Sequence, residues 1–330
     1  MKHALGILLF AACAGLSHAA PTANSFANDP AVIEFALDLE RRHGFDANEL
    51  LQQFAQVRSN DTVLRLIKPP TSPTQRSWER YRSRFLNEQR IERGVRFWQE
   101  NQVSLIKASV LYGVPPEIIV AIIGVETVYG GNTGNFRVLE ALATLAFRYP
   151  RRAEFFLTEL EQFLLLAREN GMDPVAIRGS FAGAIGIPQF MPGSQRRYAV
   201  DFDGDHKIDL SGSVEDAIGS VAHFLEQHGW LAGQPIAVIA RTAGEPERGL
   251  IEAGIQPSLL VADLAQQGIT AAADPQAKVT LVDLVTPGGA TEYWLGFDNF
   301  YVITRYNRSS FYAMSVFQLA EEIRARMPAQ

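Results

Sequence analysis

The stretch "GVPPEIIVAIIGVETVYGG", residues 113–131, places a single carboxylate, Glu126, at the end of an otherwise apolar run. The two prolines near its beginning suit the first turn of a helix, because the N–H that proline lacks would have no helical partner there. Three isoleucines share a helical face with the acid, at spacings i−3, i−4 and i−7: Ile123, Ile122 and Ile119. Gly130 and Gly131 then predict the end of the helix. The sequence therefore predicts a lone acid at the C-terminal end of a buried helix.

The surroundings of Glu126 favour its neutral form. Both the apolar face and the negative end of the helix dipole raise the pKa of a carboxyl group. A glutamic acid that keeps its proton near neutral pH can donate that proton to a leaving group. The alternative for this residue alone is a glutamate that caps the helix or forms a salt bridge.

The composition describes an ordinary globular protein with a hydrophobic core. The chain has 330 residues, of which 47% are hydrophobic and 20% are charged, enough for two or three modules in one body. The formal net charge of −6 argues against a dedicated nucleic-acid binder, which usually carries a basic surplus. We therefore expect no nucleic acid among the partners.

The first residues predict export. Lys2, a short apolar stretch and small residues are typical of a secretory signal peptide, which we assign to residues 1–20, with cleavage after the small residues Ser17 and Ala19. We expect a soluble periplasmic protein, and the alternative is a lipid anchor through Cys13. Cys13 is the only cysteine, so the exported protein has no internal disulfide.

Hydrophobic periodicity divides the rest of the chain, and the overall pattern is that of a mainly α protein of the α+β class. Residues 21–110 read as a helical domain and residues 111–230 as a central region that contains Glu126. Residues 231–300 read as a small β domain, because short β-type runs alternate there with Gly and Pro turns. These runs are "PIAVIART", "KVTLVDLV" and "EYWLGF", and "FYVITRY" continues the pattern. We predict that residues 301–312 form a returning strand or loop and that a last helix, 310–330, packs back on the helical domain.

Three further stretches suit carbohydrate binding. The adjacent guanidinium groups of Arg151 and Arg152, at the start of a predicted helix, suit a carboxylate. The stretch "GSFAGAIGIPQFMPGS" has few long side chains, so a polymer can approach its backbone closely. It still offers hydrogen-bonding groups on Ser180, Gln189 and Gln195.

The third stretch, "FYVITRYNRSSFYAMSV", is rich in tyrosine. Aromatic faces stack on sugar rings, and an amide can hold an N-acetyl group. The candidates are Tyr301, Tyr306, Tyr312 and Asn307. Taken singly, each of the three stretches is equally consistent with turns, caps and core tyrosines.

Together, four motifs identify a family. In order and spacing, "GVPPEIIVAIIGVETVYGGNTG", "ALATLAFRYPRRAEFF", "GSFAGAIGIPQFMPGS" and "YVITRYNRSSFYAMSV" resemble the membrane-bound lytic transglycosylase B family of bacterial murein-cleaving enzymes. The resemblance runs from about Pro30 to the C-terminus. It implies a lysozyme-like catalytic core flanked by a helical domain and a small antiparallel β domain. It also implies a peptidoglycan substrate, cut between N-acetylmuramic acid and N-acetylglucosamine, and no organic cofactor.

The same resemblance implies roles for individual residues. Glu126 falls on the family's single catalytic glutamate, and Arg151 and Arg152 fall on residues that bind the muramoyl side. Tyr81, which its helical spacing alone would place in the core, falls on a substrate-binding tyrosine. Phe224 stands where the family commonly has a tyrosine; the hydrogen bond of that phenol is absent here, but the ring can still stack, so the resemblance implies that Phe224 is a substrate-binding residue. The residues around the cut bond are Ser180, Gln189, Tyr306, Asn307 and Tyr312.

A lone acid can suffice if the substrate supplies the other groups, although glycosidases commonly use two carboxylates. We hypothesise that Glu126 protonates the leaving oxygen and then takes a proton from the C6 hydroxyl of the same muramoyl unit. That hydroxyl closes a 1,6-anhydro ring, so no water is consumed. The alternatives are a hydrolysing muramidase and a non-catalytic murein-binding scaffold. Proteins of cell-wall synthesis or remodelling are further candidate partners.

The stretch "DFDGDHKIDLSGSVED", residues 201–216, resembles a calcium-binding loop. Positions 1, 3 and 5 are the carboxylates of Asp201, Asp203 and Asp205, and Lys207 would offer its carbonyl at position 7. Position 6 is not glycine and position 12 is not glutamate, which departs from the standard motif. The family's longer variant of this loop is closed by a later acid, for which Asp216 is the candidate and Glu215 the alternative. We predict a structural Ca²⁺, since carboxylates this dense repel one another without a cation.

Overall fold

The computed structural model describes residues 25–69 and 77–328, which fall into two units divided between Arg58 and Ser59. The first unit contains two helices, α1 (Pro30–His43) and α2 (Ala47–Ala55). Each helix begins after an aspartate whose carboxylate accepts a hydrogen bond from a first-turn N–H, as favoured N-cap residues do. The predicted signal peptide and Cys13 lie outside the described residues.

The second unit carries every other helix of the described chain. In the first part of the unit these are α3 (Asp61–Leu66), α4 (Trp78–Arg82), α5 (Glu88–Glu100) and α6 (Gln102–Tyr112). The middle of the unit has α7 (Pro116–Thr127), α8 (Val138–Arg148), the short 3₁₀ helix η2 (Pro150–Arg152), α9 (Ala153–Glu169), α10 (Pro192–Tyr198) and α11 (Val214–Gln227). The remainder are α12 (Arg248–Glu252), α13 (Val261–Gln266), α14 (Asp298–Tyr306) and α15 (Ser310–Arg326).

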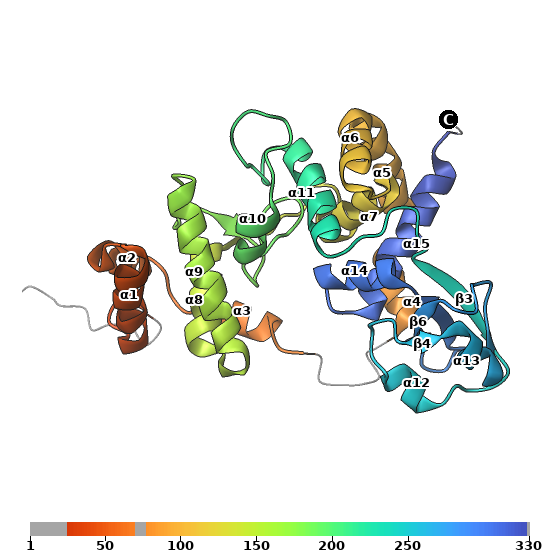
Figure 1. The fold of residues 1–330 in the computed structure, drawn as a ribbon. Coiled ribbons are helices and arrows are strands. Elements are labelled where there is room, and N and C mark those ends of the chain that lie inside the picture. Colours follow the sequence, from red (N-terminus) through yellow and green to blue (C-terminus); the bar gives the residue numbers. More distant parts are fainter. Residues whose placement is uncertain (1–24, 70–76, 329–330) are drawn as a thin grey trace, which may run out of the picture. The chain divides into compact units, whose positions relative to one another are not determined.

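Helix α7 is the centre of this unit. All residues from Ile118 to Val125 are buried, and a helix that is apolar all round must be covered on every side. It packs against α5, α6, α11 and α15 (Figure 1). The predicted buried helix that ends near Glu126 is confirmed, with Pro116 as its first residue.

A sharp bend separates α7 from α6. Gly113 ends α6 with a left-handed backbone (φ 71°), and helix α7 begins directly after Pro115. In the described part of the chain, no single helix is long and apolar enough to cross a membrane, and only α6 and α7 together, bent by 114°, have the required length and composition.

Five antiparallel strands form the main sheet, in the order β4-β6-β7-β3-β5. They are β3 (Ala237–Thr242), β4 (Leu259–Leu260), β5 (Ile269–Thr270), β6 (Lys278–Leu284) and β7 (Glu292–Gly296). On one face, α13 packs apolar residues such as Leu264 against the sheet, while Val282 and Leu284 join the core that contains α7 and α15. A separate two-stranded sheet pairs β1 (Phe136–Arg137) with β2 (Arg178–Gly179). Three of the predicted β-type runs are therefore strands.

The fourth run, "FYVITRY", was predicted wrongly as part of a returning strand or loop. It forms the end of helix α14, and only residues 307–309 separate α14 from α15. Its buried residues Phe300, Val302 and Ile303 cover one face of a helix against the same core as α7. Tertiary packing has therefore overridden the β propensity of this run.

The structure also divides the predicted helical domain differently. Helices α1 and α2 belong to the first unit, whereas α4, α5 and α6 share one core with α7. The last helix, α15, packs on α4 and α5 as predicted, and in addition along α7.

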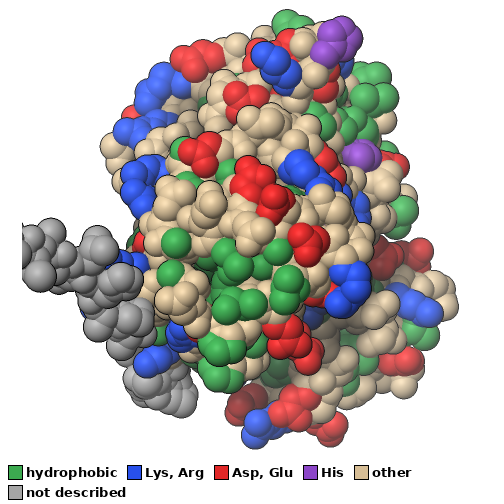
Figure 2. Space-filling view, turned by 90° about the vertical axis from the view of Figure 1, so that its left-hand side faces the viewer, with side chains coloured by type: hydrophobic (Ala, Val, Ile, Leu, Met, Phe, Trp, Pro, Cys, Tyr) green, Lys and Arg blue, Asp and Glu red, His purple; other side chains and the backbone are tan. Residues whose placement is uncertain are grey.

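The surface drawn in Figure 2 carries acidic and basic side chains interspersed with one another. This face has no continuous basic stripe, which agrees with the negative net charge.

Candidate active site

Glu126 occupies the last turn of α7 with apolar neighbours on its own helix. Ile119, Ile122 and Ile123, which share its helical face, are fully buried. Glu126 itself is half-buried, so part of its surface remains open to a substrate. Burial raises the pKa of its carboxyl group to about 7, and a hydrogen bond from Tyr312 opposes part of that rise. The carboxyl group therefore lies at the predicted end of a buried helix, and its pKa is raised in the predicted direction.

Tyr312, on α15, is the hydrogen-bond partner of Glu126. Its hydroxyl donates to Glu126 Oε1 at 2.6 Å. The Tyr312 side chain is 2% exposed, so the core fixes its ring. The ring of Tyr306 lies nearly parallel to it, at 6.4 Å and 13°, and the Tyr306 hydroxyl donates to the carbonyl of Pro188 at 2.6 Å. Two predicted tyrosines therefore meet at the acid, and only one of them contacts it by hydrogen bond.

The backbone after Glu126 is strained. Helix α7 ends at Thr127, three residues before the predicted glycine stop, and Val128 and Tyr129 adopt left-handed conformations with φ of 55° and 61°. Such conformations are costly for non-glycine residues, above all for a β-branched valine, and persist only where neighbours enforce them.

Three side chains hold this turn in place, and the sequence analysis missed all of them. The guanidinium group of Arg90 donates to the carbonyl of Gly124 at 2.6 Å, at the end of α7. The Tyr129 hydroxyl donates to the carbonyl of Arg90 at 3.0 Å. Thr127 donates to the carbonyl of Ile187 at 2.8 Å and accepts from Gly130 N–H at 2.9 Å. A polar Thr in an otherwise apolar run was the only signal in the sequence, since Arg90 acts from 34 residues away.

The glycine-rich stretch 179–194 folds into tight turns. A Cβ atom on Gly179 would lie 2.2 Å from the carbonyl oxygen of Ala184, so only glycine fits there. The Ser180 hydroxyl accepts from Ala184 N–H at 3.0 Å, which leaves its own proton available. The Gln189 amide donates to the carbonyls of Thr133 and Gly186, at 3.0 and 2.9 Å. Ser180 and Gln189 therefore use some of their hydrogen-bonding groups within the loop itself.

Gln195 was predicted to offer its side-chain amide to a ligand, but in the structure that amide is buried. It lies on α10, is 7% exposed, and its side-chain oxygen is buried without a hydrogen-bond partner among the described residues. The reason is its helical position, which turns the side chain into the protein rather than along the preceding loop.

The other aromatic candidates surround the acid at different depths. Tyr81 is half-buried against Phe311, at 5.6 Å between ring centroids, and the Glu126 charge contributes to raising the Tyr81 pKa, after burial. Phe224 is 4% exposed and packs its edge against the Tyr306 ring at 4.9 Å. Phe224 therefore backs Tyr306 and does not itself face a ligand, contrary to the prediction. Asn307 is exposed where α14 ends.

Arg151 and Arg152 lie in η2, directly before α9, and both are exposed. The Arg152 guanidinium lies over the Phe155 ring, 4.2 Å from its centroid. Neither arginine forms an ion pair with Glu154, Glu159 or any other described residue. Glu159 instead accepts from the Gly193 N–H at 2.8 Å. The alternative that these arginines pair with acids of their own helix is therefore not supported, and both charges are available to a ligand.

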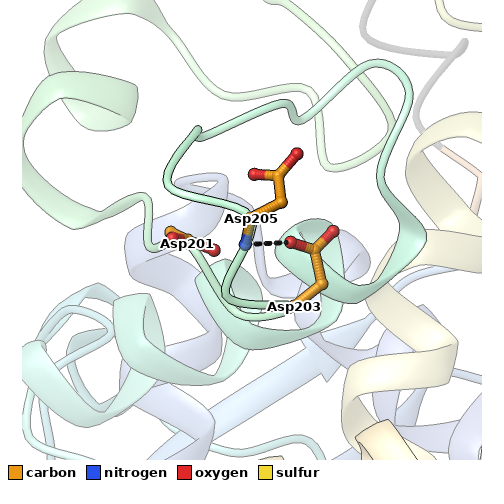
Figure 3. A group of neighbouring side chains, drawn as sticks. All are labelled: Asp201, Asp203 and Asp205. Carbon is orange, nitrogen blue, oxygen red and sulfur yellow. Dashed lines mark hydrogen bonds between the residues drawn. The ribbon is translucent and has the colours of Figure 1, made fainter.

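The acidic loop before α11 brings three carboxylates together. Oxygens of Asp201, Asp203 and Asp205 lie within 4.8 Å of one another. Figure 3 shows the three side chains in the same loop. Asp201 accepts from two loop N–H groups, and Asp203 accepts from Asp205 N–H at 3.1 Å. Lys207 follows with its N–H bonded to Asp205. These hard oxygen donors in one concave turn fit a calcium ion.

Asp216 is not in that group, contrary to the prediction that it completes the ligand set. It is 1% exposed, and its two oxygens accept from Phe202 N–H at 2.7 Å and Asp209 N–H at 2.8 Å. The first turn of α11 carries this carboxylate under the loop, where it ties the two ends of the loop together. The candidate metal group therefore consists of the three exposed and half-exposed aspartates alone.

Comparison with known proteins identifies the family. The family model described as "Transglycosylase SLT domain" matches residues 27–321. The membrane-bound lytic murein transglycosylase B of Escherichia coli is 44% identical over 313 residues, which cover 90% of this chain and 84% of that protein.

Solved structures of relatives agree in sequence and fold. The soluble lytic transglycosylase SltB1 of Pseudomonas aeruginosa is 47% identical with a TM-score of 0.84, covering 90% of this chain and 99% of that one. The Escherichia coli lytic transglycosylase Slt35, in complex with bulgecin A, is 43% identical with a TM-score of 0.84, covering 92% and 95%. The predicted lysozyme-like fold class and the predicted family are thus confirmed. The chain belongs to the transglycosylase SLT domain family and is a lytic murein transglycosylase, a lyase that acts on peptidoglycan.

Proposed function

We propose that this enzyme cuts the bond between N-acetylmuramic acid and N-acetylglucosamine and leaves a 1,6-anhydromuramoyl end. Glu126 acts first as the acid and then as the base. One observation carries this proposal: Glu126 is half-buried on an apolar helix face, with its pKa raised to about 7 by burial. Near neutral pH such a group holds and releases a proton with similar ease, as a residue that serves in both roles must.

A single acid is enough because the substrate supplies the remaining groups. Burial and the Tyr312 hydrogen bond account for the pKa of Glu126, and no second carboxylate of the described chain contributes to it. The absence of a neighbouring carboxylate from these causes supports a reaction that uses one acid in place of the usual two. In the proposed reaction, Glu126 protonates the leaving glycosidic oxygen while the 2-acetamido carbonyl of the muramoyl unit stabilises the developing cation. The Glu126 carboxylate then takes the C6 hydroxyl proton as that oxygen attacks C1, and the high effective concentration of an intramolecular group favours this attack.

Tyr312 positions the acid. Its hydroxyl donates to Oε1 of Glu126 and leaves the other carboxyl oxygen to carry the transferable proton. The same bond stabilises the carboxylate that remains after the first transfer. Ser180, whose proton is available, and Asn307, which is exposed, are the donors that we assign to the acetamido group.

Tyr81 and Tyr306 are the aromatic surfaces that we assign to sugar rings. The Glu126 charge contributes to raising the pKa of both phenols, which indicates that both lie close to the acid. We assign the exposed guanidinium groups of Arg151 and Arg152 to a carboxylate of the muramoyl lactyl group or its attached peptide. Solved relatives support this substrate: SltB3 of Pseudomonas aeruginosa, 30 and 31% identical, has been crystallised with NAG-anhNAM-pentapeptide and with NAG-NAM-pentapeptide.

We further propose a structural calcium ion at Asp201, Asp203 and Asp205, with the Lys207 carbonyl as an additional ligand. The three clustered carboxylates support this, and a 43% identical relative, Slt35, has been crystallised in complex with calcium. A bound ion would neutralise the repulsion among the carboxylates and so stabilise the loop that leads into α11.

We also propose that the enzyme is exported to the periplasm, where peptidoglycan lies. The signal-like first 20 residues support export, and lipidation of Cys13 is the alternative route to the same compartment. Proteins of cell-wall synthesis or remodelling remain candidate partners.

The mass of the sugar ends released from purified murein tests the mechanism. A 1,6-anhydro end is lighter by one water than a hydrated reducing end. We expect anhydro ends throughout the digest, and hydrated reducing ends in their place would identify a hydrolysing muramidase instead.

A further inference from the structure

Strand β3 has an edge that is only partly covered. On one side it pairs with β7 over Ala237 to Ala240. On the other side, β5 covers only Arg241 and Thr242. Among the residues that the structure describes, four residues of β3 therefore have a neighbouring strand on one side only.

The hydrogen-bond pattern fixes which backbone groups are open. Phe297 N–H donates to the carbonyl of Ile236, so Ile236 forms a hydrogen-bonded pair across to β7. In an antiparallel ladder such pairs alternate along the strand, so Val238 and Ala240 also bond toward β7. The N–H and C=O groups of Ala237 and Ile239 therefore point to the opposite edge. The bonds to β5 agree with this alternation: Ala243 N–H donates to the carbonyl of Gly268, so the odd-numbered residues of this segment bond toward the β5 side.

The chain after β5 turns away from this edge. Antiparallel register would place Ala272 opposite Ile239, two residues beyond the pair of Thr270 and Arg241. Instead, Ala273 N–H donates to the carbonyl of Ala271, which closes a tight turn at this point. In the described part of the chain, no strand therefore pairs with Ile239 on this side.

A cavity of about 840 Å³ lies along the open edge, between the sheet and α15. Its large lining side chains include Ile239, Trp294 and Phe317, and Ala271 and Ala272, which follow β5, also line it. Ile239 is 59% exposed and lies directly opposite Trp294 in the ladder, and the Trp294 ring packs edge-on against Phe317 at 6.1 Å. Proteins usually protect such an edge with charges, proline or a covering segment, and neither of the two open residues is charged or a proline.

The rim of the cavity carries charges of both signs. Arg241 and Glu322 line it, and neither forms an ion pair with another described residue. Arg82 donates through Nε to Gln318 at 2.6 Å, and its remaining guanidinium N–H groups have no described partner.

We propose that the open edge of β3 binds an extended segment of a partner protein as an added antiparallel strand in line with β5. Backbone bonds to Ala237 and Ile239 would hold the segment, as in other cases of strand addition. The open edge is four residues long, so four or five residues of ligand fill it. Side chains opposite Ala237 and Ile239 share the face of Trp294 and Phe317 and should be apolar. The side chains of the segment that lie between and beside these two positions point to the opposite face of the sheet.

The probe is the synthetic peptide acetyl-Glu-Val-Thr-Val-Lys-amide, added to the ¹⁵N-labelled exported chain. We expect a Kd of about 1 mM or tighter, with the largest amide shifts at Ile239 and Ala237 and a shift of the Trp294 indole N–H. The matched control peptide carries N-methyl groups on both valines. It keeps every side chain and loses the two donors that face β3, so we expect at least about tenfold weaker binding.

Two chain variants test the same bonds from the other side. Ile239→Pro removes an outward N–H that no strand uses, and proline is tolerated at such edge positions. We expect it to keep its melting temperature and its murein cleavage but to lose the peptide. Ile239→Val keeps the N–H and should bind as the parent does. If Ile239→Pro fails to fold, the N-methylated peptide alone decides the question.

Several results would overturn the proposal. Equal binding of the N-methylated peptide would exclude a backbone ladder, and unshifted Ile239 and Ala237 amides at about 1 mM peptide would exclude the site. Shifts of the Ile239 amide with protein concentration alone would identify a second copy as the occupant. A soluble murein peptide that shifts the Ile239 amide, where the all-L probe does not, would make this edge a substrate site instead.

Discussion

Tyr312 donates a 2.6 Å hydrogen bond to Glu126 across 186 positions of sequence. One residue ends a helix in the middle of the chain, and the other belongs to the last helix. The bond works against burial: burial raises the pKa of Glu126, and the hydroxyl lowers it. The value of about 7 is the balance of the two.

Replacing the acid should abolish cleavage without unfolding the protein. Glutamine has nearly the volume of glutamate and can still accept the Tyr312 hydrogen bond, but it cannot donate a proton to the leaving oxygen. General acid catalysis by one group contributes roughly 10²–10⁴-fold, and here the same group is also the base. We expect Glu126→Gln to bind murein and to lose turnover at or beyond the upper end of that range. More than about a tenth of wild-type turnover would assign the acid to another residue.

The same variant should become more stable than the wild type as the pH rises. The folded-state pKa of Glu126, about 7, lies above the ordinary value of 4.5, so the folded protein holds the proton more tightly than the unfolded chain. Below pH 4.5 the group is neutral in both states and has no effect; above pH 7 the folded state bears the full cost of a buried charge. That cost is roughly 3 kcal/mol. Glu126→Gln, which is always neutral, should match the wild type at pH 4 and exceed its free energy of unfolding at pH 8. Denaturant melts at both pH values measure the difference, and a constant difference would contradict a raised pKa.

Removing the Tyr312 hydroxyl should move the pH profile of cleavage. Tyr312→Phe deletes the bond that lowers the pKa of Glu126, so that pKa rises further. Activity that needs the protonated acid is lost as pH rises through this pKa, so the alkaline limb of kcat/KM should shift to higher pH. Tyr306→Phe is the control, because the Tyr306 hydroxyl bonds to Pro188 and not to the acid. An unmoved limb in Tyr312→Phe would show that its hydroxyl serves structure alone.

Arg151→Ala should weaken murein binding selectively. A charge-assisted contact to a carboxylate contributes about 1.5–3 kcal/mol, which corresponds to roughly ten- to a hundredfold in Kd. Chitin oligomers carry no lactyl carboxylate, so their binding should barely change. The melting temperature should also hold, since Arg151 forms no ion pair with Glu154 or Glu159 among the described residues. Equal losses on both polymers would contradict a carboxylate contact.

Calcium should raise the melting temperature of the wild type by several degrees relative to chelated buffer. Binding to the folded state alone adds about 2.7 kcal/mol at a hundred times Kd. Asp205→Asn removes one of the three clustered charges and should lose most of that increment. Asp173→Asn is a matched control, since Asp173 also accepts a backbone N–H in an exposed turn, but outside the cluster. The same wild-type melting temperature with and without calcium would refute the site.

The sequence predicted those parts of the site that depend on local pattern. Helical spacing alone put Glu126 on the face of Ile119 and Ile122, and burial of that face raises its pKa as expected. Helix α14 was missed because a short β-branched and aromatic run satisfies both periods, and only its packing against α15 decides for helix.

Other features depend on contacts that spacing does not encode. Asp216 has the right chemistry for a metal ligand, but the first turn of α11 directs it to Phe202 and Asp209 N–H groups. Arg90 contacts the end of α7 from another helix, so no local sequence motif predicts this hydrogen bond. The left-handed Val128 is likewise unpredictable from propensity, which disfavours it.

Tyr312 belongs to α15, so the hydrogen bond to Glu126 can form only after this late helix has been synthesised. Synthesis runs from the N-terminus, so α7 and its acid emerge well before the helix that supplies the hydroxyl. A product that stops before Ser310 keeps Glu126 but lacks Tyr312, and it also lacks Phe311 and Met314, which help bury α7. A chain without α15 therefore keeps the acid but loses both the hydroxyl that bonds to it and part of the core that buries its helix, and we expect such a chain not to cleave murein.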